Sequence, residues 1–254
     1  MNASARARAR ETPPPPERRL RCATVATAFA IALAACTPAP RPSAPSADQP
    51  PAGFPEAAYL QAAHRGEPVF RIVPAQSLVV VEVRRGGRLG HLGHDHVVST
   101  DDLQGYLNPV AGRADLYLRL DRLVVDDPAL RAAAGFTTQP SPAAIAGTRT
   151  NMLEKTLRAH EHPYAWIAVS GFIPADANWR GEVALEVAIT LHGRTHRQTV
   201  PAEVDAGAGR IAAQGALGLR QTDFGIEPMS ILGGAIRVED ALTLRFRLVA
   251  ERLR

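Results

Sequence analysis

Residues 182–191 read EVALEVAITL, and apolar side chains occupy every second position of this stretch. The alternating apolar residues are Val183, Leu185, Val187, Ile189 and Leu191. A period of two residues is that of a β-strand with one face packed against apolar groups and the other face in water. The stretch therefore predicts an amphipathic strand.

The same alternation recurs along most of the chain. Residues 114–121 read ADLYLRLD, and residues 242–248 read LTLRFRL. Further candidate strands cover residues 77–84, 90–99, 103–108, 164–174, 197–204 and 210–219. Eight or nine antiparallel strands of this kind must close into a barrel or pack as a sandwich, because an open sheet would expose its edges and its apolar face.

Two helices are expected between the strands. Asp127-Pro128 and Ser141-Pro142 each place a capping side chain before a proline at the first helical position. They predict a short helix over 128–134 and a longer one from 142 to about 158. A helical insertion of this length and the scarcity of aromatic residues for interfacial girdles argue against an outer-membrane barrel.

The amino terminus has the order of a bacterial export signal. Six arginines precede an uncharged, mostly apolar stretch over 22–35, which is shorter than the ~20 residues that a membrane-spanning helix needs. Residues 33–36, LAAC, look like a lipobox, which predicts cleavage before Cys36 and acylation of its sulfur. Thr37 stands where an Asp would favour inner-membrane retention, so we expect a lipid anchor on the periplasmic face of the outer membrane.

Three segments follow from this interpretation. Residues 1–35 are expected to be the signal peptide, residues 36–67 the lipidated cysteine with a Pro/Ala-rich linker, and residues 68–254 one β-rich domain. The linker holds seven prolines between positions 37 and 56, which is typical of a semi-extended tether. Residues 57–66 are either a short helix or more linker.

Charge and cysteine content exclude several classes of function. Residues 1–35 hold six Arg and two Glu, which leaves 23 basic and 23 acidic residues in the rest of the chain. A nucleic-acid surface is therefore not expected. Only Cys22 and Cys36 occur, so the exported domain has no thiol for a disulfide, a cluster or a nucleophile. No G-x-S-x-G elbow, Walker sequence or H-E-x-x-H occurs, so we expect no catalytic residues and no enzymatic activity.

Three further stretches carry a resemblance to a known family. They are GTRTNMLEKTLRAHEHP at 147–163, VAITLHGRTHRQTVP at 187–201 and LRQTDFGIEPMSILGGAIRVEDALTLRF at 219–246. Their order and spacing resemble the YceI-like family, and GHDHVV at 93–98 is similar to a subgroup of it.

The resemblance implies an antiparallel, lipocalin-like β-barrel of about eight strands with one or two inserted helices. It further implies that the interior binds a polyisoprenoid or a quinone, and it admits a homodimer. The side chains expected to line such an interior are Leu118, Val183, Leu185, Val187, Leu244 and Phe246. If side chains instead fill the interior, the domain is a ligand-free scaffold.

Three histidines form the sharpest chemical feature of the sequence. On a strand, His94 and His96 would point the same way, and His91 or a distant carboxylate would supply a third ligand. This pattern predicts a metal site, with a metalloprotein or hydrolase as the alternative function, or a polar contact for a ligand headgroup. The competing interpretation is that Gly90 and Gly93 permit a bulge and the histidines satisfy nearby backbone groups.

Overall fold

The computed structural model describes residues 49–171, 179–207 and 209–254. The expected signal peptide, Cys36 and the first part of the linker lie outside the described residues, as does the end of the expected strand over 164–174. Among the described helices, none combines the length and the apolar character that crossing a bilayer requires.

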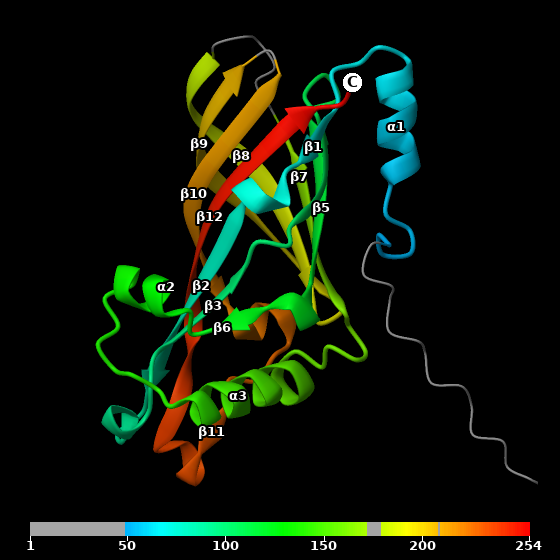
Figure 1. Cartoon of the computed structure of the whole chain (residues 1–254). Helices are drawn as coiled ribbons and strands as arrows, with labels where there is room; N and C mark the ends of the chain where they lie inside the picture. The colour runs from blue at the N-terminus through cyan, green and yellow to red at the C-terminus, as the bar shows by residue number, and fades with distance from the viewer. Residues whose placement is uncertain (1–48, 172–178, 208) are drawn as a thin grey trace, which may run out of the picture. The chain divides into compact units, whose positions relative to one another are not determined.

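One antiparallel sheet closes on itself (Figure 1). The ring closes because β1 pairs with β4 on one side and with β12 on the other. Its strands, in spatial order, are β1 (Phe70–Ile72), β4 (Gln104–Asn108), β5 (Arg113–Arg119), β7 (Tyr164–Ser170), β8 (Trp179–Leu191), β9 (Arg194–Gly207), β10 (Arg210–Arg220) and β12 (Ile236–Arg252). Eight strands enclose an interior that side chains can fill or that can hold one small ligand. The predicted fold class is confirmed.

Three ring strands continue after short breaks toward one end of the barrel. β2 (Leu78–Gly86) follows β1 and β6 (Val124–Val125) follows β5 along the chain, whereas β3 (His96–Thr100) precedes β4. The breaks include the 3₁₀ turns η1 (Pro74–Gln76) and η3 (Leu120–Arg122). β2 pairs with β12 and β3, β3 also pairs with β6, and the short β11 (Ser230–Ile231) pairs with β12. Further 3₁₀ turns are η5 (Gln221–Phe224) and η6 (Leu232–Gly234).

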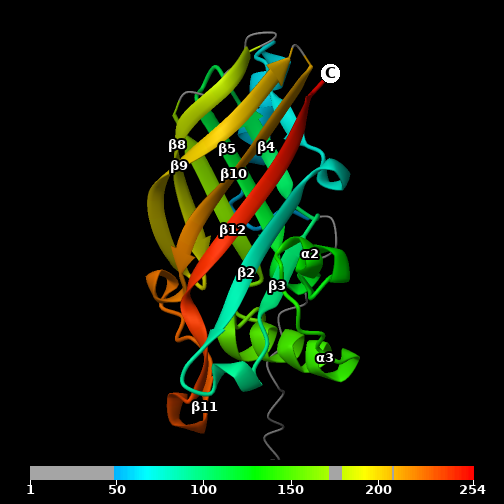
Figure 2. The same cartoon turned by 90° about the vertical axis from the view of Figure 1, so that its left-hand side faces the viewer.

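Both predicted helices form, with the expected caps. Asp127 accepts hydrogen bonds from two backbone N–H groups of α2 (Pro128–Ala133), and Ser141 accepts one in α3 (Pro142–Asn151). A π-helical stretch, η4 (Met152–Thr156), then extends α3. The two views in Figures 1 and 2 place α3 at the end of the barrel away from the C-terminus. The Arg149 guanidinium holds it there by donating to the carbonyls of Asp121 and Leu123.

Residues 90–99 do not form the single strand that we expected. Gly90–Leu92 is a 3₁₀ turn (η2), and β3 begins only at His96. The Asp95 carboxylate accepts the backbone N–H of Arg85 at 3.0 Å, so a side chain replaces the next step of the strand pairing. His91 and His94 therefore lie outside the sheet.

Part of the predicted linker packs on the outside of the barrel. α1 (Glu56–His64) buries Tyr59, whose hydroxyl donates to the Asp115 carboxylate at 2.6 Å and whose ring stacks on Tyr106. The Tyr106 hydroxyl donates back to Glu56 at 2.7 Å. The Phe54 ring lies edge-on against β5 and β7, at 4.8 Å from Tyr117. Residues 54–64 of the expected linker are therefore fixed to β4 and β5.

We predict that Tyr59→Phe weakens this attachment. The Asp115 carboxylate loses a buried charge-assisted hydrogen bond, which costs about 1.5–3 kcal/mol. Trypsin cleavage after the exposed Arg65 should then accelerate by about tenfold or more. The control is Tyr164→Phe, whose hydroxyl is more exposed. Equal cleavage of Tyr59→Phe and the unmodified chain would contradict the attachment.

Candidate functional site

The barrel interior contains an open space rather than a filled core. A cavity of about 390 Å³ runs between the strands, and a second of about 70 Å³ continues it toward β1. The two share wall residues at their junction, namely Leu116, Val169, Leu185, Ala213 and Leu248. Their combined volume falls within the range of ~300–1,000 Å³ that is typical of small-molecule pockets.

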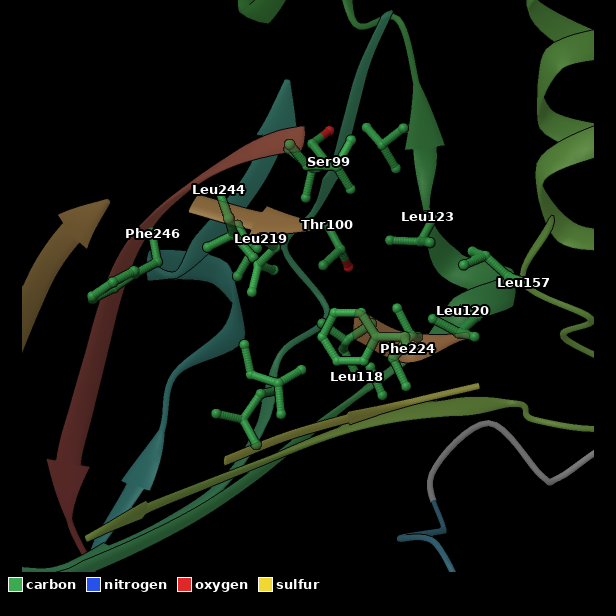
Figure 3. A pocket seen from close by; sticks show the side chains of 18 of the residues that line it. Ser99, Thr100, Leu118, Leu120, Leu123, Leu157, Leu219, Phe224, Leu244 and Phe246 are labelled. Carbon is green, nitrogen blue, oxygen red and sulfur yellow. The ribbon is translucent and has the colours of Figure 1, made fainter. Parts of the chain in front are cut away.

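The space exists because the inward side chains are short. Val, Leu, Ile and Ala dominate the wall, and Phe224 and Phe246 are the only Phe, Tyr or Trp side chains among the wall residues that the structure describes. Figure 3 shows Leu118, Leu120, Leu219 and Phe224 converging from different elements of the fold. An eight-stranded barrel is wide enough either to be filled by its inward side chains or to hold one small ligand, and here the inward side chains leave space.

The larger cavity has no charged side chain among its described wall residues. Its polar groups are those of His96, Ser99, Thr100, Thr148, Asn151, Thr156 and Gln221. Thr148, Asn151 and Thr156 come from α3 and η4, so the helical insertion supplies part of the wall at that end. An ionised ligand group would lose its hydration here and meet no opposite charge. The site suits an uncharged molecule.

The structure places all six predicted interior residues on the cavity walls. Leu118, Leu185, Val187, Leu244 and Phe246 line the larger cavity, and Val183 lines the smaller one. They come from β5, β8 and β12. Alternate residues of a strand point to the same face, so the period-two pattern placed these side chains together on one face of each strand.

The three predicted histidines are separated by the fold. His91 and His94 are exposed, whereas His96 is the first residue of β3 and lies in the cavity wall. The rings of His94 and His96 lie 6.4 Å apart, edge to face. In the described part of the chain, no three His, Cys, Asp or Glu side chains come together as ligands for one metal ion.

A buried ion pair lies behind His96. The His96 Nδ1 atom lies 2.6 Å from Asp126 Oδ2, and the Asp126 side chain is fully buried. Asp126 Oδ1 accepts from the Val97 N–H at 3.1 Å and from Arg131 Nη1 at 2.5 Å. The Arg131 guanidinium also donates to the carbonyls of Asp95 and Thr138 and stacks near Phe136. Two elements, β3 and α2, are thus fixed to the turn after β6.

The ionised form of Asp126 is the favoured one. Burial by itself would raise the pKa of this carboxyl, but the hydrogen bonds from His96, the Val97 N–H and Arg131 lower it below the ordinary value. Asp126 also has a left-handed backbone, with φ of 59°. Asp and Asn adopt this conformation more readily than most residues.

Comparison with known proteins assigns the family. A model of the YceI-like domain matches residues 70–250, a range that includes residues of every strand of the barrel. The chain belongs to the YceI-like family. The comparison with curated proteins found no match.

Several solved structures are similar to this chain at low sequence identity. A polyisoprenoid binding domain from Saccharophagus degradans, implicated in plant cell wall breakdown, is 15% identical with a TM-score of 0.53, covering 74% of this chain and 99% of that chain. BcnA from Burkholderia cenocepacia is 15% identical with a TM-score of 0.46, covering 70% and 98%. A YCEI protein from Campylobacter jejuni is 13% identical with a TM-score of 0.37, covering 60% and 82%.

Sequence reasoning did not find the Asp126–Arg131 pair. Asp126 stands beside Asp127, whose capping role the sequence does predict, but nothing in the local pattern indicates that Asp126 reaches β3. The two adjacent Asp residues could have indicated the pair, because a helix needs only one N-cap and the other carboxylate is then available for a different partner.

Proposed function

We propose that this YceI-like domain holds one long, uncharged apolar chain, a polyisoprenoid or a prenylated quinone, inside its barrel. The observation that carries this proposal is the cavity of about 390 Å³ with no charged residue in its described wall. The resemblance to the polyisoprenoid binding domain of Saccharophagus degradans supports the choice of ligand class.

The cavity volume sets the length of chain that fits without rearrangement. A methylene group is about the size of a water molecule, ~30 Å³, so the two cavities hold about fifteen carbons, or three isoprene units. At about 0.8 kcal/mol per buried CH₂, transfer from water contributes about 12 kcal/mol, against association costs of about 4–15 kcal/mol. A longer chain would extend out of the barrel.

Lipid extraction tests the proposal. The full chain is produced in an export-competent bacterium and purified, and the chloroform–methanol extract is analysed by mass spectrometry. We expect an isoprenoid at about one molecule per chain, enriched over the extract of an unrelated lipoprotein purified in the same detergent. An extract with only general phospholipids, in equal amounts for both proteins, would overturn the proposal.

The anchor belongs to the same proposal. Acylation of Cys36 would hold the barrel at the periplasmic face of the outer membrane, where the proline-rich segment before residue 54 provides the free length. The ligand would then exchange with the adjacent leaflet or with an anchored partner, and the homodimer remains a prediction.

We predict that Cys36→Ser abolishes acylation of the protein. The serine hydroxyl cannot form the thioether to diacylglycerol, so labelled palmitate should not be incorporated. The control is Cys22→Ser, which leaves the lipobox intact and should be labelled normally. Equal labelling of the Cys36→Ser variant and the unmodified chain would contradict the anchor.

A further inference from the structure

His96 lines the cavity, and one edge of its imidazole ring has no hydrogen-bond partner among the described residues. It pairs with Val83 across β2 and β3, and Val79, Val81 and Val83 all line the cavity, so His96 points inward with them. Asp126 contacts only the Nδ1 edge of the ring. The opposite edge carries Nε2, which forms no hydrogen bond with any residue that the structure describes.

The protonation of the ring follows from its partner. An ionised carboxylate only accepts hydrogen bonds, so the His96 Nδ1 atom carries the proton that it shares with Asp126. In the neutral imidazole Nε2 then has a lone pair and accepts. The guanidinium of Arg131 balances the charge of Asp126, so no excess positive charge remains behind the ring to attract a phosphate or a carboxylate.

The other polar wall residues are less suited to define a ligand head. Gln221 donates its amide to the Glu239 carbonyl at 2.9 Å, which already fixes that side chain. Ser99, Thr100, Thr148 and Thr156 carry hydroxyls, which rotate to donate or accept, and the Asn151 amide likewise both donates and accepts. His96 is the wall residue that a buried ion pair holds in one tautomer and one orientation.

We propose that His96 Nε2 accepts a hydrogen bond from a hydroxyl on the bound chain, so that the site selects hydroxylated isoprenoids over ethers and hydrocarbons of the same length. This selection rests on the proposed function of the barrel. The hydroxyl belongs either to a prenyl alcohol or to a prenylated phenol or hydroquinone, because both present the same donor.

A competition between matched ligands tests the selection. Full-length protein is incubated with an equimolar mixture of farnesol and farnesyl methyl ether, and the ratio of the two in the protein-bound fraction is measured by mass spectrometry. Detergent competes equally with both, so it does not change the ratio. One hydrogen bond is expected to favour farnesol by about tenfold. A second mixture, of farnesylated hydroquinone and its dimethyl ether, tests the phenolic source.

The deciding variant is His96→Asn. The Asn amide nitrogen takes the place of Nδ1 and keeps the hydrogen bond to Asp126, but no atom replaces Nε2, so the fold is preserved and the ratio falls to about one. The exposed neighbour gives the matched control, His94→Asn, which should keep the unmodified ratio. A preference in either mixture that His96→Asn abolishes supports the assignment.

Two results overturn the assignment and can be told apart. If the unmodified protein binds alcohols and ethers without preference, or if His96→Asn keeps the preference, the role of His96 is wrong while the lipid-binding barrel stands. If the unmodified protein binds neither ligand in a larger amount than an unrelated lipoprotein does, both the proposed function and the assignment of His96 are wrong.

Discussion

Ala213→Trp should abolish retention of the lipid. Ala213 lies on β10, and its side chain lines both cavities at their junction, so an indole there would fill the middle of the chain's path. If the indole displaces about five of the fifteen carbons, the lost transfer free energy is about 4 kcal/mol, or about 1,000-fold in Kd. The extract of the purified variant should therefore contain no enriched isoprenoid.

The matched control for this variant is Ala216→Trp. Ala216 is exposed on the opposite face of the same strand, so the new side chain lies outside the barrel. Circular dichroism establishes that both variants fold. Lipid retained equally by Ala213→Trp and Ala216→Trp would show that the chain binds somewhere other than the cavity.

A charged side chain in the cavity wall should also reduce lipid binding, although it does not fill the cavity. Leu185→Glu places a carboxylate at the junction of the cavities, whereas Ala184→Glu places the same group on the exposed face one residue earlier. The inward carboxylate is desolvated by a bound chain, so only Leu185→Glu should lose lipid. The loss should be larger at pH 8 than at pH 5, because protonation removes the charge of the carboxyl group. The amounts of lipid extracted from Leu185→Glu and from Ala184→Glu are compared at each pH.

Asp126→Asn should lower the stability of the fold by about 3–5 kcal/mol. The substitution leaves the Arg131 guanidinium buried without its carboxylate partner, and Asn tolerates the left-handed backbone at this position, so the effect is electrostatic. For a domain of this size the melting temperature should fall by about 6–20 °C, measured by circular dichroism. The control is Asp127→Asn, because Asn caps a helix as well as Asp does.

The pair of Asp126 and Arg131 should make the stability of the fold depend on pH. The pKa of Asp126 is lowered in the folded state, so its ionised form contributes stability above its unfolded pKa of about 3.9, and this contribution is lost as the pH falls through the lower folded value. The difference in stability between the unmodified chain and Asp126→Asn should therefore narrow below about pH 4. A constant difference from pH 7 to pH 3 would contradict the assigned role of the carboxylate.

The strands were the most predictable part of the fold. Alternation in 182–191 and 242–248 predicts strands that the structure contains within β8 and β12, and it predicts which side chains face inward. The prediction of one strand over 90–99 was wrong, because Gly90, Gly93 and the Asp95 side chain favour a local turn over sheet pairing. The hydrophobic period of a sequence does not show whether a local turn competes with sheet pairing. The position of α1 also escaped prediction, since its contacts with Tyr106 and Asp115 join residues far apart in sequence.

The site was predictable in its apolar part and not in its polar part. Leu185 and Leu244 follow from the strand pattern, and whether they fill the barrel depends on the size of the side chains opposite them, which only the closed sheet reveals. His96 stood out as a residue type, but its partner Asp126 is set by the pairing of β3 with the turn after β6. Long-range pairing of this kind has no local signature.

Native mass spectrometry of the intact, purified protein measures the content of the barrel most directly. The account predicts one additional non-covalent mass per chain, in the range of an isoprenoid lipid, which is released on activation and is missing from Ala213→Trp. Spectra that contain only the covalently modified polypeptide, under conditions that preserve the bound lipid of a known carrier, would contradict it.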